Sequence, residues 1–250
     1  MCDIEKEVLD AAVAKLKETN ADVAGVVADV SLKEQLQAAA EATLARYGEV
    51  HIVHNNAGVG GGGSYATGWN DAGWDWTIAV NLRAVIWGVE VFGPLIERHG
   101  QGGHIVNTAS VAGLISGSAN AYNVTKYGVV ALSEGLRVEL APRGIGVSVL
   151  CPGIIRTNIT DSQRNLPERF ADARPTPDAA NAIPPAWIES LRARIAVGID
   201  PLYVGELVRE AIEGDWPYIF TDNEFEPFID NRFANIKAGF DRIRGRTPAH

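Results

Sequence analysis

The stretch GHIVNTASVAGLISGSANAYNVTKYGVVALSEGLRVELAPRGIGVSVL, residues 103–150, decides the fold. Residues 104–108 form a short apolar run that is typical of a buried strand, and residues 146–150 form another. Between them, residues 122–141 carry apolar side chains at helical spacing. A strand, a helix and a strand in this order predict two parallel strands joined by a right-handed helical crossover.

The same alternation of strand and helix extends to both sides of this unit. It predicts an α/β fold with a doubly wound parallel sheet, similar to the Rossmann fold, as one domain over residues 1–250. In such sheets ligands bind at the carboxyl ends of the strands. Ser31 and Glu34 fit a capping box, which predicts the start of a helix. The further helices are expected at about residues 4–19, 31–47, 74–98, 206–213 and 224–243, and the further strands at 23–28, 51–54 and 218–221.

Composition excludes several classes of protein. The 250 residues hold 22 Lys and Arg against 31 Asp and Glu, a net charge of −9 that repels nucleic acid and anionic membranes. No run of about 18 apolar residues appears, and the first residues do not form a signal peptide. Cys2 and Cys151 are too few for a disulfide framework, and Cys151 lies in an apolar run, where we expect a core residue. We expect a soluble, cytoplasmic protein that binds neither nucleic acid nor a membrane.

Residues 156–201 differ in character from the rest of the chain. Several prolines prevent one continuous helix there, and a connection of this length is usually functional. We expect a lid or insert that covers the substrate. The prolines are Pro167, Pro175, Pro177, Pro184 and Pro185.

Tyr122 and Lys126 lie four residues apart on a predicted helix, so their side chains project from one face. An ammonium beside a phenol favours the phenolate and lowers its pKa, which suits the phenol to acid–base chemistry near neutral pH. Such a pair also arises by chance, so its surroundings matter. Ser110 follows a strand, Asn81 interrupts an apolar helix face, and residues 55–58 close another strand. These positions converge on the carboxyl edge of the predicted sheet.

Five motifs occur in a fixed order and spacing. They are Asn-Asn-Ala-Gly at 55–58, Val-Asn-Leu at 80–82, Asn-Thr-Ala-Ser-Val-Ala-Gly at 107–113, Tyr122-x-x-x-Lys126 and Pro152-Gly153-x-x-x-Thr157. Through them the chain resembles the short-chain dehydrogenase/reductase family over residues 1 to about 160. The resemblance implies that Tyr122 is the general acid/base and that Lys126 lowers its pKa and holds the nicotinamide ribose. It also implies that Ser110 orients the substrate oxygen and that Asn81 holds a water that relays protons to Lys126.

The same resemblance implies a nicotinamide cofactor, NAD rather than NADP. Asp3 matches the acid at the end of the family's second strand, where a carboxylate binds ribose and repels a 2′-phosphate; alternatively, Asp3 caps the helix that follows. Asp29 and Val30 resemble the family's adenine contact, although Asp29 equally suits the turn before Ser31. Thr157 and Ile155 would hold the nicotinamide carboxamide. The implied cofactor-binding residues are Asp3, Asp29, Val30, Asn56, Ala57, Gly58, Tyr122, Lys126, Pro152, Gly153, Ile155 and Thr157.

The family's glycine-rich phosphate loop has no counterpart in this sequence. Gly58-x-Gly60-x-x-Gly63 fits the dinucleotide pattern, but no helix starts promptly after it and no strand-end acid follows. The chain opens where the family's second strand ends, so we expect an N-terminal truncation: the first strand, the first helix and most of the second strand are absent. Loss of the first strand, which is central in the family's sheet, would separate strands 23–28 and 51–54, and the remaining strands would either re-pair or leave exposed edges. The chain should then bind dinucleotide poorly.

The implied activity is the interconversion of a secondary alcohol and a ketone by hydride transfer. Apolar residues at the expected pocket and lid suggest an apolar or aromatic substrate. Two alternatives stay open: a non-catalytic scaffold on the same fold, and an epimerase or dehydratase. The expected substrate contacts are Leu114, Ile115, Phe170, Ile183 and Trp187.

The resemblance also implies a homodimer or homotetramer, formed through the helices at 74–98 and 122–141. Trp76, Leu136 and Val138 are the expected contributors to that interface.

No metal site is expected. His51 and His54 lie three apart on a predicted strand, so they point to opposite faces. The remaining histidines, His99, His104 and His250, form no ligand cluster with cysteine.

Overall fold

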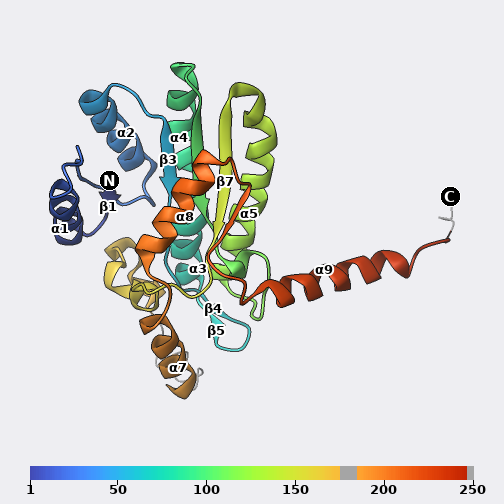
Figure 1. Ribbon diagram of the computed structural model, residues 1–250. Helices are drawn as coiled ribbons and strands as arrows, with labels where there is room; N and C mark the ends of the chain where they lie inside the picture. Colours follow the sequence, from blue (N-terminus) through green and yellow to red (C-terminus); the bar gives the residue numbers. More distant parts are fainter. Residues whose placement is uncertain (175–184, 247–250) are drawn as a thin grey trace.

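In the computed structural model, which describes residues 1–174 and 185–246, a four-stranded parallel sheet forms the centre of the molecule (Figure 1). Its strand order is β3–β6–β7–β8. β6 and β7, which precede and follow α5 in the sequence, pair in parallel, so the predicted strand–helix–strand unit is confirmed. The strands are β3 (Ile52–Asn55), β6 (Gly103–Thr108), β7 (Ile145–Cys151) and β8 (Tyr218–Phe220). The helices around them are α2 (Lys33–Tyr47), α4 (Ala84–Arg98), α5 (Ala121–Leu140), α8 (Pro201–Glu213) and α9 (Glu226–Asp241).

Helices cover both faces of this sheet, because neighbouring residues of a strand point to opposite sides. Ile105 of β6 packs with Ile96 of α4 on one face, where α5 also lies. Val106, the next residue, packs with Val208 of α8 on the other face. The expected Rossmann-like layering is therefore confirmed for this sheet.

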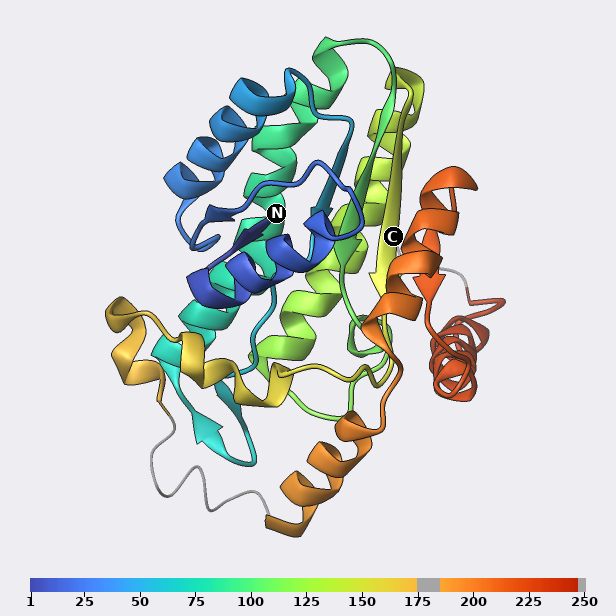
Figure 2. The ribbon, with the colours of Figure 1, turned by 60° about the vertical axis from the view of Figure 1, so that its left-hand side comes forward.

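The N-terminal strands form a separate sheet. β1 (Cys2–Asp3) pairs in parallel with β2 (Val26–Val27), and α1 (Lys6–Lys17) lies beside them (Figure 2). β2 does not pair with β3 in the described part of the chain, so of the two outcomes left open these strands take the one with an exposed edge. β3 is therefore an edge strand, and its Ile52 is 50% exposed. The parallel strands thus form two separate sheets: a pair, β1 and β2, and the four-stranded sheet of β3, β6, β7 and β8.

The helix predicted at residues 74–98 begins earlier and contains a π-helical turn. α3 (Asp71–Ile78) continues through the π turn (Ala79–Arg83) into α4. The Asn70 side chain caps its start by accepting a hydrogen bond from the Gly73 amide at 2.7 Å. Against expectation, the combined helix is long and apolar enough to cross a membrane, with a mean hydropathy of 1.4 in its most apolar window. One third of that window is buried, and Ile96 is fully buried against the sheet.

The capping box predicted at Ser31 and Glu34 is wrong. The Ser31 oxygen would have to accept a hydrogen bond from a helix amide, but it accepts one from Arg169 instead, while its hydroxyl donates to Asp29 Oδ1 at 2.6 Å. α2 begins at Lys33, and its N-cap residue, Leu32, provides no side-chain hydrogen bond. Asp29 therefore takes part in the turn before Ser31, which was the alternative to its expected role as an adenine contact.

The described part of the predicted lid contains two 3₁₀ segments, Ile159–Asn165 and Glu168–Ala173, and α7 (Pro185–Ala196). The first segment touches the loop after β3, where Gly60 N donates a hydrogen bond to Ser162 Oγ at 3.2 Å. An unpredicted hairpin of two-residue strands, β4 (Gly63–Ser64) and β5 (Gly68–Trp69), follows that loop. Pro175, Pro177, Ile183 and Pro184 lie outside the described residues, as does His250.

Candidate active site

α5 places the two residues of the predicted acid–base pair at its first turns. The Asn120 side chain caps α5 by accepting a hydrogen bond from Asn123 N at 2.8 Å. Lys126 is 3% exposed, and its Nζ donates a hydrogen bond to Thr108 O, at the end of β6, at 2.9 Å. The same Nζ lies 5.6 Å from the centre of the Tyr122 ring. The predicted pair therefore meets at the carboxyl end of β6.

Burial moves the pKa of both groups away from its ordinary value. It lowers the pKa of Lys126 to about 8, because a buried ammonium loses its hydration. It raises the pKa of Tyr122, and a hydrogen bond with Ser110 offsets only part of this rise. The expected lowering of the phenol pKa by Lys126 is therefore not observed. The ammonium is bonded to the Thr108 carbonyl and lies over the ring face, so the cost of burial dominates.

A tight turn places Ser110 beside this pair. Ser110 precedes the 3₁₀ turn Val111–Gly113, and its Oγ accepts a hydrogen bond from Ala112 N at 3.1 Å. A Cβ on Gly113 would lie 2.6 Å from Lys126 O, so only glycine allows the turn to pack this closely on α5. The Ser-Val-Ala-Gly sequence therefore sets how closely Ser110 approaches α5.

Asn81 is fully buried in the π turn. Its Oδ1 accepts a hydrogen bond from Val59 N, and its Nδ2 donates one to Val59 O, both at 2.8 Å. The amide that was expected to hold a water thus anchors the loop after β3. This anchor brings the Asn56–Ala57–Gly58 segment to the site, because a Cβ on Gly58 would lie 3.5 Å from Lys126 Nζ. π turns inside α-helices are frequent at functional sites.

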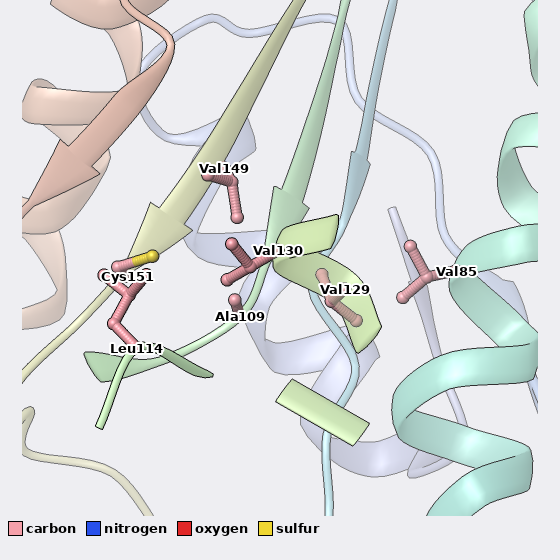
Figure 3. Packing of buried hydrophobic residues seen from close by; sticks show 7 residues of the cluster. All are labelled: Val85, Ala109, Leu114, Val129, Val130, Val149 and Cys151. Carbon is pink, nitrogen blue, oxygen red and sulfur yellow. The ribbon is translucent and has the colours of Figure 1, made fainter. Parts of the chain in front are cut away.

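A hydrophobic cluster joins α5, β7 and the Ser110 loop, as Figure 3 shows. Leu114 lies beside Cys151 in this cluster and is 8% exposed, so it contributes to the core, and its role as a substrate contact stays a prediction. Ile115, one residue later, is half-buried. Burial raises the pKa of the Cys151 thiol to about 12, in keeping with the core position expected of it.

The loop after β7 closes another side of the site. Pro152 O accepts a hydrogen bond from the first amide of the 3₁₀ turn at 3.1 Å. Gly153 N donates one to Thr221 Oγ1 at 3.0 Å. Ile155 forms a β-bridge with the segment after α7, and Thr157 is exposed. Ile155 and Thr157, which were expected to hold the carboxamide, therefore lie in the loop directly after β7, the strand next to β6.

At the far end of the predicted cofactor site, the acidic side chains have protein partners. Asp3 Oδ1 accepts a hydrogen bond from Glu5 N at 2.8 Å, while its side chain stays exposed. Asp29 Oδ2 pairs with Arg169 Nη2 at 2.6 Å. Burial by itself would raise the pKa of Asp29, but hydrogen bonds from Ser31 and Arg169 outweigh it and lower that pKa.

The segment 159–173 covers this end of the site. Phe170, expected to touch substrate, packs instead in a cluster with Val30 and Trp76. Trp187 of α7, the other expected aromatic contact, is 57% exposed. The structure therefore packs Phe170 on the same cluster as Val30, a predicted adenine-binding residue, and leaves Trp187 on the surface.

The residues expected at a subunit interface are mostly internal. Trp76 is 1% exposed, and Leu136 packs against the core cluster of α4 and β6. The assignment of Trp76 to an interface is therefore wrong, whereas Leu136 is only partly buried and stays a prediction. Val138 is 76% exposed and stays a prediction.

One cluster of possible metal ligands lies outside this site and was missed. Ligand atoms of Glu49, His51 and His99 lie within 4.8 Å of one another. Hydrogen bonds to Gln101 take up all three: its side chain bonds Glu49 and His51, and its main-chain N bonds His99. The two imidazole rings lie with their centres 4.4 Å apart and are tilted by 35° to each other. His54 bonds Thr108 instead, as expected for the opposite face.

Fold and site together define an α/β protein with a half-buried tyrosine beside a buried lysine and a buried serine at the ends of parallel strands, an arrangement suited to acid–base chemistry on a hydroxyl. A family model described as short chain dehydrogenase matches residues 1–167. The chain belongs to this family and is an oxidoreductase of the short-chain dehydrogenase type.

Known proteins align with most of the chain. A C alpha-dehydrogenase of Sphingobium sp. (strain NBRC 103272 / SYK-6) is 30% identical over 239 residues, which are 94% of this chain and 76% of that protein. The levodione reductase of Leifsonia aquatica is 32% identical over 188 residues, 70% of each chain. A short chain dehydrogenase/reductase from Burkholderia phymatum, crystallised in complex with NAD, is 35% identical with a TM-score of 0.87, covering 100% of this chain and 87% of its own. Because the alignment extends over this whole chain, it does not support the expected N-terminal truncation.

Proposed function

We propose that this protein is an NAD-dependent oxidoreductase that interconverts an apolar or aromatic secondary alcohol and the corresponding ketone. The proposal depends above all on the buried Lys126 ammonium, which the Thr108 carbonyl holds beside the Tyr122 ring. Burying an ammonium is unfavourable, and a binding module or scaffold has no need of it. A dehydrogenase and a reductase among the relatives support this class of reaction.

Each residue of the group has one task in this reaction. The Tyr122 phenol gives a proton to the substrate oxygen or takes one from it. Ser110 orients that oxygen, and the positive charge of Lys126 favours the phenolate when substrate and cofactor change its surroundings. NAD, when bound, accepts or supplies the hydride. Alcohol oxidation needs the phenolate, so the raised pKa of Tyr122 predicts that oxidation becomes faster as the pH rises.

The residues present fit the nicotinamide end of NAD. Gly58 leaves room beside Lys126, and the main-chain amides and Thr157 hydroxyl of the loop after β7 suit a carboxamide. At the other end, Asp3 is exposed at a strand end, where a carboxylate suits ribose hydroxyls and repels a 2′-phosphate. Asp29 is paired with Arg169, so this ion pair must open before Asp29 can reach the adenine.

Tyr122→Phe tests the proposal. We expect oxidation of a panel of aryl and alicyclic secondary alcohols to fall by roughly 10²–10⁴-fold, the usual contribution of a general acid/base. NAD binding, measured by calorimetry, should be unchanged. Tyr127→Phe is the matched control, because Tyr127 lies on the same helix and packs against Arg232 away from Ser110. Equal turnover by Tyr122→Phe and the unmodified protein would remove Tyr122 from this role.

A further inference from the structure

Three possible metal ligands lie together at the amino ends of β3 and β6, the opposite end of the sheet from Tyr122 and Lys126. Glu49 and His51 come shortly before β3, and His99 follows the last residue of α4. Their ligand atoms lie within 4.8 Å of one another. Two imidazole nitrogens and one carboxylate oxygen are typical ligands of zinc, whereas magnesium and calcium prefer oxygen ligands alone. The chemistry of this set therefore suits zinc.

The main chain that carries these ligands is held by the core. Val50, between Glu49 and His51, is buried in the cluster of α4, β6 and β7. His51 O accepts a hydrogen bond from His104 N of β6 at 2.9 Å. A Cβ on Gly103 would lie 2.3 Å from the same carbonyl oxygen, so glycine lets the loop between α4 and β6 come this close. The ligand side chains reach the surface from a fixed main chain, which is what a preorganised site requires.

One of the two imidazoles is already in the tautomer that a metal needs. His99 Nε2 lies 2.8 Å from Val50 O, and a carbonyl oxygen can only accept, so Nε2 carries the proton. Nδ1 is then the acceptor nitrogen, and Gln101 N donates a hydrogen bond to it at 3.2 Å. Histidines that bind metals usually donate their second N–H to a carbonyl or carboxylate, which fixes the tautomer and the orientation of the ring. His99 therefore offers Nδ1 as a metal ligand.

The other two ligand atoms are nearly at the spacing that zinc requires. Bonds of about 2.1 Å to a tetrahedral zinc ion set neighbouring ligand atoms about 3.4 Å apart. His51 Nε2 and Glu49 Oε2 are 3.7 Å apart. The side chain of Gln101 bridges them: its Oε1 accepts from His51 Nε2 at 3.1 Å, and its Nε2 donates to Glu49 at 2.8 Å. Gln101 is exposed, so its side chain can turn into water when an ion takes its place.

We propose that Glu49 Oε2, His51 Nε2 and His99 Nδ1 bind one zinc ion, with water as the fourth ligand. On binding, the ring proton of His51 moves from Nε2 to Nδ1, and the ion replaces the hydrogen bonds of Gln101. The ion links the residues before β3 to the end of α4. In the described part of the chain, β3 has a strand partner on one side alone, so this link stabilises the edge of the sheet. The site lies away from the acid–base residues and is separate from the proposed reaction.

Calorimetric titration of the untagged chain with zinc chloride tests the site and needs no cofactor or substrate, so its outcome is independent of the proposed activity. A Cys2→Ser background removes the exposed thiol as a competing ligand, and Cys151 is buried. We expect one zinc ion per chain, and a loss of affinity of roughly tenfold or more in both His51→Ala and Glu49→Gln. His54→Ala is the matched control, because His54 lies at the other end of β3 and bonds Thr108. Absence of saturable binding, or equal binding by His51→Ala and His54→Ala, would overturn the proposal.

Two further variants test the ligand set. His99→Gln removes Nδ1 and should weaken zinc binding as much as His51→Ala does. Gln101→Ala should bind zinc at least as tightly as the Cys2→Ser parent, because the Gln101 side chain competes with the ion for Glu49 and His51. Circular dichroism without metal checks that each variant is folded. Weaker binding by Gln101→Ala, or unchanged binding by His99→Gln, would refute this set of three ligands.

Discussion

Lys126 places an ammonium where almost no water reaches it, with the Thr108 carbonyl as its hydrogen-bond acceptor. Because burial lowers its pKa from 10.5 to about 8, the folded protein binds fewer protons than the unfolded chain between these values. The free energy of unfolding therefore rises with pH between these two pKa values. Below them, the cost of burying the Lys126 charge is constant. From this group alone we expect the free energy of unfolding to be about 2 kcal/mol greater at pH 9.5 than at pH 7.

Urea denaturation at the two pH values measures this rise. Lys126→Met should lose it, whereas Lys15→Met, a change on the exposed surface of α1, should keep it. An unchanged pH dependence in Lys126→Met would show that the ammonium is not buried at this cost.

Asp3 gives a prediction about the choice of cofactor. An exposed carboxylate at the end of β1 repels a 2′-phosphate, so Asp3→Ser should bring the NADP and NAD dissociation constants closer by about tenfold, or 1.4 kcal/mol. Calorimetric titration with both dinucleotides measures the ratio, with Asp10→Ser on α1 as the surface control. If the ratio of the two dissociation constants is unchanged, Asp3 does not select the cofactor, and its role is to accept the hydrogen bond from Glu5 N.

The residues of the site could be predicted from the sequence, but their electrostatics could not. The spacing of Tyr122 and Lys126 and the place of Ser110 after a strand depend on local pattern alone. The raised pKa of Tyr122 depends on how deeply the fold buries the phenol, and this is not encoded at any one position. Leu114 is the converse case: a loop leucine suggested a pocket wall, yet its side chain completes the core beside Cys151.

At the scale of elements, the 3₁₀ turn Val111–Gly113 fixes Ser110 against α5. Gly113→Ala would force a Cβ to within 2.6 Å of Lys126 O, so the turn and the helix must separate. We expect a loss of about 1–3 kcal/mol in stability, the usual effect of overpacking, together with a fall in kcat. Gly117→Ala is the control, since nothing lies within 4 Å of its Cβ. Thermal unfolding and turnover measure both effects, and equal behaviour of the two variants would contradict this role of the turn.

Long periodic elements followed from the sequence, whereas short and irregular ones did not. α5, β6 and β7 lie within one or two residues of their predicted bounds, because many residues contribute to each pattern. The hairpin of β4 and β5 has only two residues in each strand, too few for a periodic signal. The π turn lies inside an apolar helix, and the polar residue Asn81 is the one feature of the sequence that marks its position. The capping box failed because the Ser31 oxygen accepts a hydrogen bond from Arg169, a residue far away in the sequence, rather than from a helix amide.

At the scale of the whole molecule, the segment 159–173 joins the N-terminal unit of β1, α1 and β2 to the rest. Arg164 pairs with Glu5 at 2.9 Å, and Arg169 pairs with Asp29 at 2.6 Å. Such partly exposed ion pairs each contribute little. Phe170 packs against the cluster around Trp76, and so does Val30, which follows the N-terminal unit in the chain. Apolar burial should therefore dominate this connection.

Phe170→Ala tests whether this packing holds the two parts together. Removing a large, partly buried ring should raise amide hydrogen exchange in residues 1–31 by roughly tenfold or more, because the two sheets share no hydrogen-bonded strand pair among the described residues. Exchange in β6 and β7, measured in the same mass-spectrometry experiment, should not change, since their hydrogen bonds lie inside the four-stranded sheet. Trp187→Ala is the matched aromatic deletion, and its side chain is 57% exposed, so it should leave both regions as they are. A uniform rise across both sheets in Phe170→Ala would mean that they unfold as one cooperative unit, and no rise at all would mean that the ion pairs suffice.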